Sequence, residues 1–348
     1  MEVYFLAPFA GDKDGSLGSY YESDDYRRQI DSWFAPLGLS WHWQPVTHAT
    51  LAEVVGRLQR LRETQELVVF NACDGVDVEG FPGLSVVRAL ERAAIPFTGA
   101  ASAFYEITTS KIAMKQRMAA RGVATAPFLE ITDIERDIPR AAAKIGFPFI
   151  LKPSVSAGSA GITDRSVVHD EASAIAQARR MQAAPRDLFH YYEGLFAEAF
   201  LGGREFTVFL VAGAGGSVQV YPPVERVFDA SLPRTRRLLS FDRYWERYEE
   251  EEPLPGGGLF YSYADAPAAL RAPLEDLSAR AFAALDGSGY ARVDIREDDG
   301  NGALQVLEVN SNCGITSDDQ TSVGRILNSN GIAMSAVIRR ILDDALSR

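Results

Sequence analysis

Residues 290–310 read YARVDIREDDGNGALQVLEVN, the pattern of two apolar strands joined by a turn of Asp, Gly and Asn. Alternate residues of a strand share a face, so Arg292 projects beside Asp294, and Glu308 beside Asn310. If the strands pair as a hairpin, three oxygen donors (Asp294, Glu308 and Asn310) gather on one face. Mg²⁺ prefers such ligands and keeps substrate phosphates and waters as further ones. Arg292 could then hold a phosphate or carboxylate through two hydrogen bonds.

These four residues also have a simpler interpretation. Glu308 and Asn310 would lie on a solvated strand face, while Asp294 and Arg292 form a salt bridge. However, the four polar residues interrupt apolar runs, and burying them without a metal or partner is costly. The pattern slightly favours a metal site, and from these residues alone both interpretations stay open.

Composition limits the class of protein. The chain has 348 residues, which suggests two or three domains. Its apolar content of 47% is ample for a buried core, and its net charge of −12 disfavours a nucleic-acid or anionic-membrane surface. Two cysteines, Cys73 and Cys313, are too few for a disulfide framework. With no signal peptide or long apolar run, a cytoplasmic protein is expected.

The order of strand and helix patterns predicts an α/β (α+β) protein with three parts. Residues 1–105 alternate strands and helices, which predicts a small Rossmann-like domain with a parallel sheet. Residues 106–190 contain a helix that opens at Ser110 and a strand at 147–152. Residues 191–348 are dominated by strands and include a long polar segment at 228–263, which is typical of a functional lid or of disorder. The individual elements expected are strands at 3–7, 67–71, 95–98, 204–211, 218–227, 290–296 and 303–309, and helices at 51–61, 85–94, 110–120, 136–144, 270–285 and 332–346.

Several residues could bind a nucleotide. Lys152 ends a strand and precedes a loop of Ser, Gly and Ala at 154–161, whose small side chains let backbone N–H groups approach phosphate oxygens. Lys111 is relevant if its ammonium group converges with that of Lys152. Glu198 could accept from an adenine amino group, and Glu205 from ribose hydroxyls. Each also has an ordinary interpretation: a flexible hairpin, a solvated helix lysine and two surface acids.

Taken in order, these segments resemble the D-alanine–D-alanine ligase branch of the ATP-grasp superfamily, over about residues 70–330. Each motif is weak to moderate by itself, but five in the right order at compatible spacing are specific. The matching segments are Phe70-Asn71-Ala72 with Ile95-Pro96-Phe97-Thr98-Gly99, Ser110-Lys111, Phe147 to Ser154, Glu198 to Val208, and Arg292-Val293-Asp294 with Leu307-Glu308-Val309-Asn310 and Gly314.

The resemblance implies an ATP-grasp fold, with an N-terminal Rossmann-like domain and a nucleotide held between two α+β subdomains. It implies ATP and Mg²⁺ (or Mn²⁺) as cofactors, two small-molecule substrates and a possible homodimer. The roles that it implies are catalysis for Arg292, Lys152 and Gly314; metal binding for Asp294, Glu308 and Asn310; and nucleotide binding for Lys111, Lys152, Ser154, Ser156, Gly158, Ser159, Gly161, Glu198, Ala199, Leu201 and Glu205.

The sequence also departs from the family pattern where substrates bind. An early Glu that recognises the first substrate's ammonium group has no clear match in residues 9–16. A family His becomes Asp74, and a hinge lysine becomes Ala199. Asp319 stands where the family uses a Ser to bind the second substrate's carboxylate. Candidate substrate contacts are Asp74, Tyr244, Ser317 and Asp319.

These observations predict an ATP-dependent carboxylate–amine ligase that acts through an acyl phosphate and does not make D-alanyl-D-alanine. The alternatives are a small-molecule phosphotransferase of the same fold, the D-alanine–D-alanine ligase itself, and a non-catalytic nucleotide-binding module. A nicotinamide dehydrogenase is disfavoured because the dinucleotide fingerprint is missing.

Overall fold

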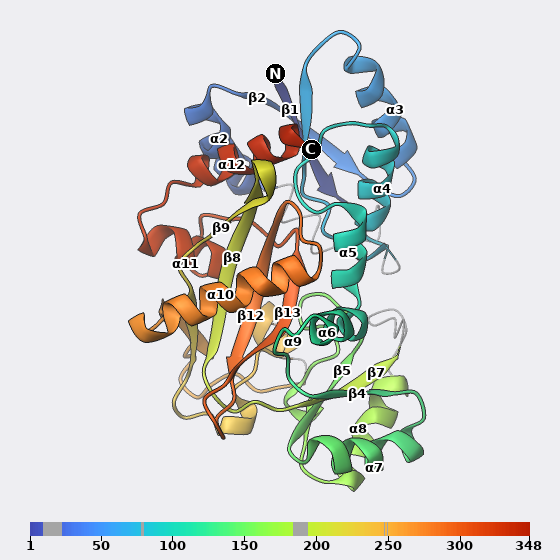
Figure 1. Ribbon diagram of the computed structural model, residues 1–348, viewed down its shortest axis with the longest axis vertical. Coiled ribbons are helices and arrows are strands. Elements are labelled where there is room, and N and C mark those ends of the chain that lie inside the picture. The colour runs from blue at the N-terminus through green and yellow to red at the C-terminus, as the bar shows by residue number, and fades with distance from the viewer. Residues whose placement is uncertain (10–22, 78–79, 184–193, 247, 249) are drawn as a thin grey trace.

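The computed structural model describes residues 1–9, 23–77, 80–183, 194–246, 248 and 250–348 and contains three sheets (Figure 1). The N-terminal sheet is parallel, with β1 (Glu2–Pro8) between β2 (Ser40–Val46) and β3 (Leu67–Asn71). Alternate residues of β1 serve two cores: Tyr4 and Leu6 pack with one cluster, and Phe5 with another. Helices therefore cover both faces, as a parallel sheet requires. They are α2 (Asp24–Phe34), α3 (Leu51–Leu61) and α4 (Leu84–Arg92).

The predicted helix at 51–61 is confirmed: Val54, Val55 and Leu58 are buried on its inner face. Helix α2 and strand β2 were not expected from the sequence. The strand predicted at 95–98 is wrong, because this segment makes only an isolated bridge between Phe97 and Val69.

The central part is built on a four-stranded antiparallel sheet. Its order is β4 (Phe128–Ile131), β7 (Leu195–Ala199), β5 (Phe149–Pro153) and β6 (Val167–Val168). The expected boundary at 190/191 would assign β7 to the last part of the chain, but β7 pairs with β4 and β5. Helices α5 (Ser102–Thr109) and α6 (Lys111–Ala120) lead into this part, and α7 (Ile134–Ile145) and α8 (Glu171–Ala183) pack beside its sheet.

The C-terminal part holds a six-stranded antiparallel sheet. Strand order is β11-β10-β8-β12-β13, with β9 also paired to β8. The strand expected at 218–227 is two strands, separated at Pro222 and Pro223, where proline removes the donors that a ladder needs. The strands are β8 (Glu205–Gly213), β9 (Ser217–Val220), β10 (Val224–Phe228), β11 (Tyr261–Asp265), β12 (Tyr290–Glu297) and β13 (Leu304–Ser311).

Successive side chains of these strands point to opposite faces of the C-terminal sheet, and part of one face is polar. Phe206, Val208 and Val293 pack beneath α10 (Ala268–Ala284), which crosses one face of the sheet (Figure 1). The opposite face is apolar at one end, where α11 (Ser322–Ser329) and α12 (Met334–Ser347) pack against Phe209. Further along, the same face carries charged residues. The fold thus places polar side chains on this face, while the apolar residues of the same strands stay packed in the core.

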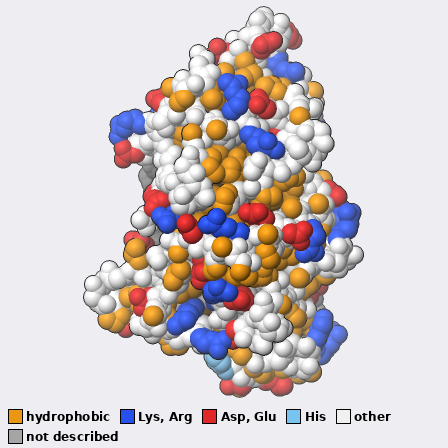
Figure 2. Space-filling view, turned by 60° about the vertical axis from the view of Figure 1, so that its left-hand side comes forward, with side chains coloured by type: hydrophobic (Ala, Val, Ile, Leu, Met, Phe, Trp, Pro, Cys, Tyr) orange, Lys and Arg blue, Asp and Glu red, His pale blue; other side chains and the backbone are white. Residues whose placement is uncertain are grey.

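The N-terminal and C-terminal parts are held together by close contacts. Gly289 has a φ of +68°, a backbone conformation that residues with a side chain rarely adopt. A Cβ atom at this position would lie 2.1 Å from the carbonyl carbon of Gly99, so only glycine fits there. Helix α12 returns from the end of the chain to pack on α2 and β3. Among the described residues, no helix is both long and apolar enough to cross a bilayer. On the face in Figure 2, acidic and basic side chains are interspersed with exposed hydrophobic ones.

Candidate active site

The predicted hairpin is present, and its polar residues form one cluster. Strands β12 and β13 are antiparallel, with Arg292 opposite Asn310 and Asp294 opposite Glu308. Asp294 Oδ2 accepts from Arg292 Nε at 3.1 Å, from Arg292 Nη2 at 2.9 Å and from Asn310 Nδ2 at 3.0 Å. Its other oxygen accepts from the Thr207 hydroxyl at 2.9 Å. The salt bridge of the simpler interpretation therefore exists, but its carboxylate, Asp294, is buried, and Arg292, Glu308 and Asn310 are half-buried beside it.

Charges around the hairpin keep Glu308 ionised. Burial raises the pKa of Glu308, but the positive charges of Lys111 and Arg292 outweigh this effect and bring the pKa to about 2. Burial also lowers the pKa of Arg292, but Asp294, together with Cys313 and Tyr244, raises it by more in sum, so the net shift is upward. The site thus offers an ionised Glu308 beside a permanent cation.

The two predicted lysines approach these acids from the central part of the fold. Lys111 is the first residue of α6, and its Nζ lies 3.7 Å from Glu308 Oε2 and 2.8 Å from the Ser156 carbonyl oxygen, to which it donates. Lys152 extends from β5 and forms an ion pair with Glu198 on β7. Its charge also contributes to the lowered pKa of Glu308. Residues from three separate stretches of sequence therefore converge.

A third lysine, Lys115, was missed in the sequence. It is 1% exposed and forms an ion pair with the Glu198 oxygen that Lys152 leaves free. The signal was present: Lys111, Met114, Lys115 and Met118 lie on one side of α6, and three of them are buried. A lysine on a buried helix face needs a carboxylate partner.

The Ser/Gly loop at 154–161 follows Lys152 directly. Gly158, Ser159 and Gly161 have φ values of +55°, +60° and +76°, a left-handed backbone that favours glycine. Ser154 is buried, with its hydroxyl 3.3 Å from that of Ser110. Lys111 Nζ is 3.3 Å from the Ser156 hydroxyl. The loop and the helix that carries Lys111 are thus tied together.

Part of the long segment at 228–263 packs on this loop. Its short helix α9 (Phe241–Trp245) donates from Trp245 Nε1 to the Gly158 carbonyl oxygen at 3.0 Å, and from Phe241 N to the Ile162 carbonyl oxygen at 2.9 Å. Glu251 accepts from Asp164 N at 2.9 Å. Residues of this segment therefore contact the loop at 154–161 and the residues that directly follow it.

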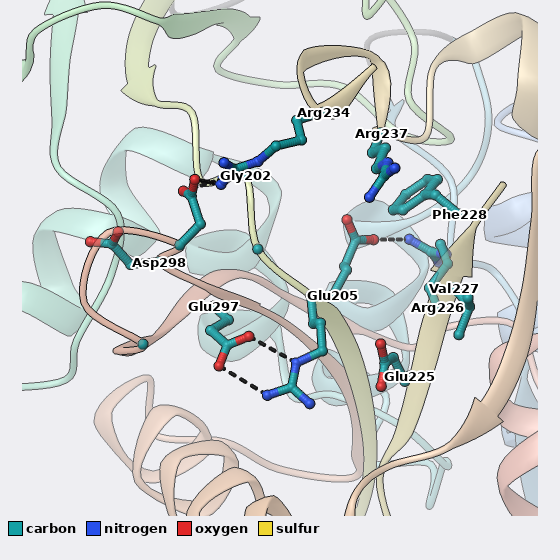
Figure 3. Close-up of a pocket in the computed structure, with 14 residues that line it drawn as sticks. Gly202, Glu205, Glu225, Arg226, Val227, Phe228, Arg234, Arg237, Glu297 and Asp298 are labelled. Atoms are coloured by element: carbon teal, nitrogen blue, oxygen red, sulfur yellow. Dashed lines mark hydrogen bonds and ion pairs between the residues drawn. The ribbon is translucent and has the colours of Figure 1, made fainter. Parts of the chain in front are cut away.

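The hinge between β7 and β8 carries the remaining predicted nucleotide contacts. Ala199 ends β7, Leu201 is 5% exposed, and Glu205 begins β8. Glu205 is buried between two arginines that the sequence did not reveal: it forms an ion pair with Arg226 on β10 and lies 3.4 Å from Arg296 Nη1 on β12. In Figure 3 this carboxylate points toward Arg226, with Arg237 and Phe228 beside it, at a polar hollow of about 420 Å³.

Comparison with known proteins agrees with this geometry. The family model described as D-ala D-ala ligase C-terminus matches residues 118–343. The chain belongs to the D-alanine–D-alanine ligase family. It is therefore placed among ATP-dependent ligases that form carbon–nitrogen bonds, and the predicted ATP-grasp fold is confirmed.

Individual relatives are distant. The D-alanine–D-alanine ligase of Bordetella petrii is 29% identical over 229 residues, which cover 66% of this chain and 62% of the relative. That of Stutzerimonas stutzeri is 29% identical over 84% of this chain and 81% of the relative. The crystal structure of the Bacillus anthracis ligase complexed with ATP superposes with a TM-score of 0.68 at 18% identity, covering 99% of this chain and 97% of that one.

The donors on the hairpin of this ligase fit a divalent cation of the Mg²⁺ type. Asp294 and Glu308 supply carboxylate oxygens, and rotating the Asn310 amide by half a turn directs its oxygen toward them. No group of three or more His, Cys, Asp and Glu side chains with metal-binding geometry occurs within the described ranges. An ion here therefore needs phosphate oxygens or waters as further ligands, which is the usual mode for Mg²⁺.

The predicted substrate residues of the ligase lie in three places. Asp74 and Gly314 both line a small hollow of about 20 Å³, whose walls include Trp33, Phe70 and Tyr290. Ser317 and Asp319 lie on the loop after β13, where Asn328 on α11 donates to the Ser317 carbonyl oxygen at 3.0 Å. Tyr244 is 44% exposed on α9 and adds to the upward shift in the pKa of Arg292, so it lies near the hairpin.

Asp319 has a partner that the sequence did not suggest. Arg325 Nη1 on α11 lies 3.3 Å from Asp319 Oδ2, and Arg325 Nη2 lies 3.9 Å from Asp265 Oδ1. Asp318 is adjacent in the chain. The loop thus places two carboxylates near the guanidinium group of α11, and Asp265 at the end of β11 adds a third. The departures predicted at residues 10–16 lie outside the described residues.

Proposed function

We propose that this ligase joins a small carboxylate substrate to an amine through an acyl phosphate, and that the amine is not D-alanine. The observation that supports the chemistry is the convergence of Arg292, Asp294 and Glu308 with the lysines of α6 and β5. A module that only binds nucleotide would not need this complete set of charges.

The charges suit a transfer of the γ-phosphoryl group. Lys111 and Lys152 would neutralise phosphate charge, while small residues at 154–161 bring backbone N–H groups close to the phosphates. A magnesium ion on Asp294, Glu308 and Asn310 would offset the charge that develops as the phosphoryl group moves. A carboxylate oxygen of the first substrate forms a bond to the γ-phosphorus as the bond to ADP breaks.

In the second half-reaction, the amine nitrogen attacks the acyl carbon and loses a proton, and phosphate leaves. The tetrahedral carbon then carries a negative oxygen. Arg292 and backbone N–H groups near Gly314 would stabilise this oxygen. Trp245 and its helix would exclude water from the acyl phosphate by packing on the Gly158 loop.

The amine specificity is inferred from the loop after β13. Asp318 and Asp319 on this loop, with Asp265 at the end of β11, outnumber Arg325 of α11, so this area is net negative and would repel the carboxylate of an amino acid. An amine that lacks a carboxylate, or that bears a second cationic group, fits this charge. The names of the relatives make D-alanyl-D-alanine the competing product.

A panel of amines tests the proposal. We expect ADP release to be faster with diamines, guanidino amines or decarboxylated amino acids than with D-alanine. Asp319→Ser should shift the ratio of kcat/KM values toward D-alanine by about tenfold, a typical effect of one charge contact. The matched control is Asp343→Ser, an exposed acid on α12. Preference of the unaltered enzyme for D-alanine over every other amine would contradict the assignment.

Replacing the amine with hydroxylamine separates ligase from phosphotransferase chemistry. An acyl phosphate reacts with hydroxylamine to give an acylhydroxamate, because the nitrogen displaces phosphate from the acyl carbon. We expect the hydroxamate to accumulate in proportion to ADP. A stable phosphorylated product with no hydroxamate would indicate a phosphotransferase instead.

A further inference from the structure

Glu198 lies between two lysines deep in the central part of the fold. Lys115 and Glu198 are each 1% exposed, while the side chain of Lys152 is 17% exposed. One Glu198 oxygen pairs with Lys115 and the other with Lys152. Two positive charges therefore share one carboxylate, and only the Lys152 side reaches solvent.

Lys115 is fixed by a second contact as well. Its Nζ donates to the Thr125 hydroxyl at 2.8 Å, and this hydroxyl donates to the Val306 carbonyl oxygen on β13 at 2.8 Å. Val306 lies two residues before Glu308. Lys115 is thereby tied to both sheets, whereas the described contacts of Lys152 lead to Glu198.

We propose that Lys115 is a positioning residue that allows Lys152 to leave Glu198 and bind the phosphates of the nucleotide. When Lys152 moves to a phosphate, Glu198 keeps one buried counter-charge from Lys115 and stays in place. Without Lys115, the same movement would leave a buried carboxylate unpaired, which is strongly unfavourable. Lys152 would then be retained by Glu198. This inference rests on the proposed role of Lys152 in phosphate binding.

Nucleotide binding to Lys115→Met distinguishes positioning from a structural role. We expect the dissociation constant of ATP to rise by about tenfold or more, the effect of losing a hydrogen bond to a charged group. Adenosine, which has no phosphates, should bind within about twofold of its original affinity. Lys115→Arg should restore much of the ATP affinity. Lys144→Met, at an exposed lysine on α7, is the matched control.

The double variant Lys115→Met/Glu198→Gln removes both buried charges and is informative if Lys115→Met folds poorly. Lys152 is then no longer held by an anion, so the affinity for ATP relative to adenosine should recover compared with Lys115→Met alone; this ratio cancels any change in the adenine contact predicted for Glu198. Equal losses for ATP and adenosine, unchanged ATP binding in Lys115→Met, or no recovery in the double variant would each overturn the inference. Lys152→Met tests its premise separately: if ATP affinity is unchanged there, the proposed role of Lys152 fails and not only that of Lys115.

Discussion

The two ends of the proposed active site are built differently. The end that we propose binds the nucleotide, called the nucleotide end, uses side chains on strands and a helix, with Lys115, Glu198 and Asp294 almost fully buried. The acceptor end uses a loop, where the side chain of Asp319 is 51% exposed and that of Arg325 is 31% exposed. Regular elements hold charges in fixed positions, whereas loops tolerate substitution.

The same difference separates the matches to the family from the predicted departure. Glu198 and Asp294 are buried and each is paired with other charges, and Glu308 is half-buried beside them. The departure predicted at Asp319 concerns an exposed residue whose partner, Arg325, comes from the next helix. Chemistry and specificity are therefore separable, and substitutions at the two ends should affect different kinetic constants.

The largest effect is expected for Glu308→Gln at the nucleotide end. Loss of this carboxylate removes a proposed metal ligand and the partner of Lys111. If the transition state loses several kcal/mol of stabilisation, kcat falls by a factor on the order of 10³. ADP release measured with saturating substrates checks this. Glu297→Gln, on β12 outside the hairpin cluster, serves as the control. Full ADP release by Glu308→Gln would remove the basis of the metal assignment.

An intermediate effect is expected for Trp245→Phe, on the helix that packs on the loop at 154–161. This change keeps a ring but removes the donor to the Gly158 carbonyl oxygen, so α9 should pack less tightly over the phosphates. We expect ATP hydrolysis without amide formation to rise about tenfold, as one lost hydrogen bond allows. Trp41→Phe removes a similar indole donor, to Asp31 on the N-terminal part. Equal ratios of ADP to amide in both variants would show that this contact does not exclude water.

Local sequence pattern was sufficient for the hairpin and for α3. In both, the spacing of apolar residues defines the element, and in the hairpin it also defines which side chains share a face. The convergence of Lys111 with Glu308 required the family resemblance in addition. Sequence order alone does not say that α6 packs against β13.

Features that depend on strand order were not predictable in this way. Arg226 and Arg296 meet Glu205 only because β10, β8 and β12 are neighbours in the sheet, although they are distant in sequence. The partner of Asp319 depends on how α11 packs. Lys115 was different, since its place on a buried helix face was visible, but its partner Glu198 lies 83 residues later in the chain.

The smallest effect concerns the pH dependence of stability at the nucleotide end. The pKa of Glu308 is lowered to about 2, against an unfolded value of about 4.3. A lowered pKa means that the ionised form stabilises the fold, fully above the unfolded value and progressively less as pH falls toward the folded one. The free energies of unfolding in urea of the unaltered protein and of Glu308→Gln should therefore differ by a constant amount from pH 7 to about pH 5. Below this range, the unaltered protein should lose stability relative to Glu308→Gln. Glu63→Gln, at an exposed position after α3, should show no such trend. A difference that is constant down to pH 3 would mean that Lys111 and Arg292 do not hold Glu308 in its ionised form, and the electrostatic contrast between the two ends would be smaller than the geometry implies.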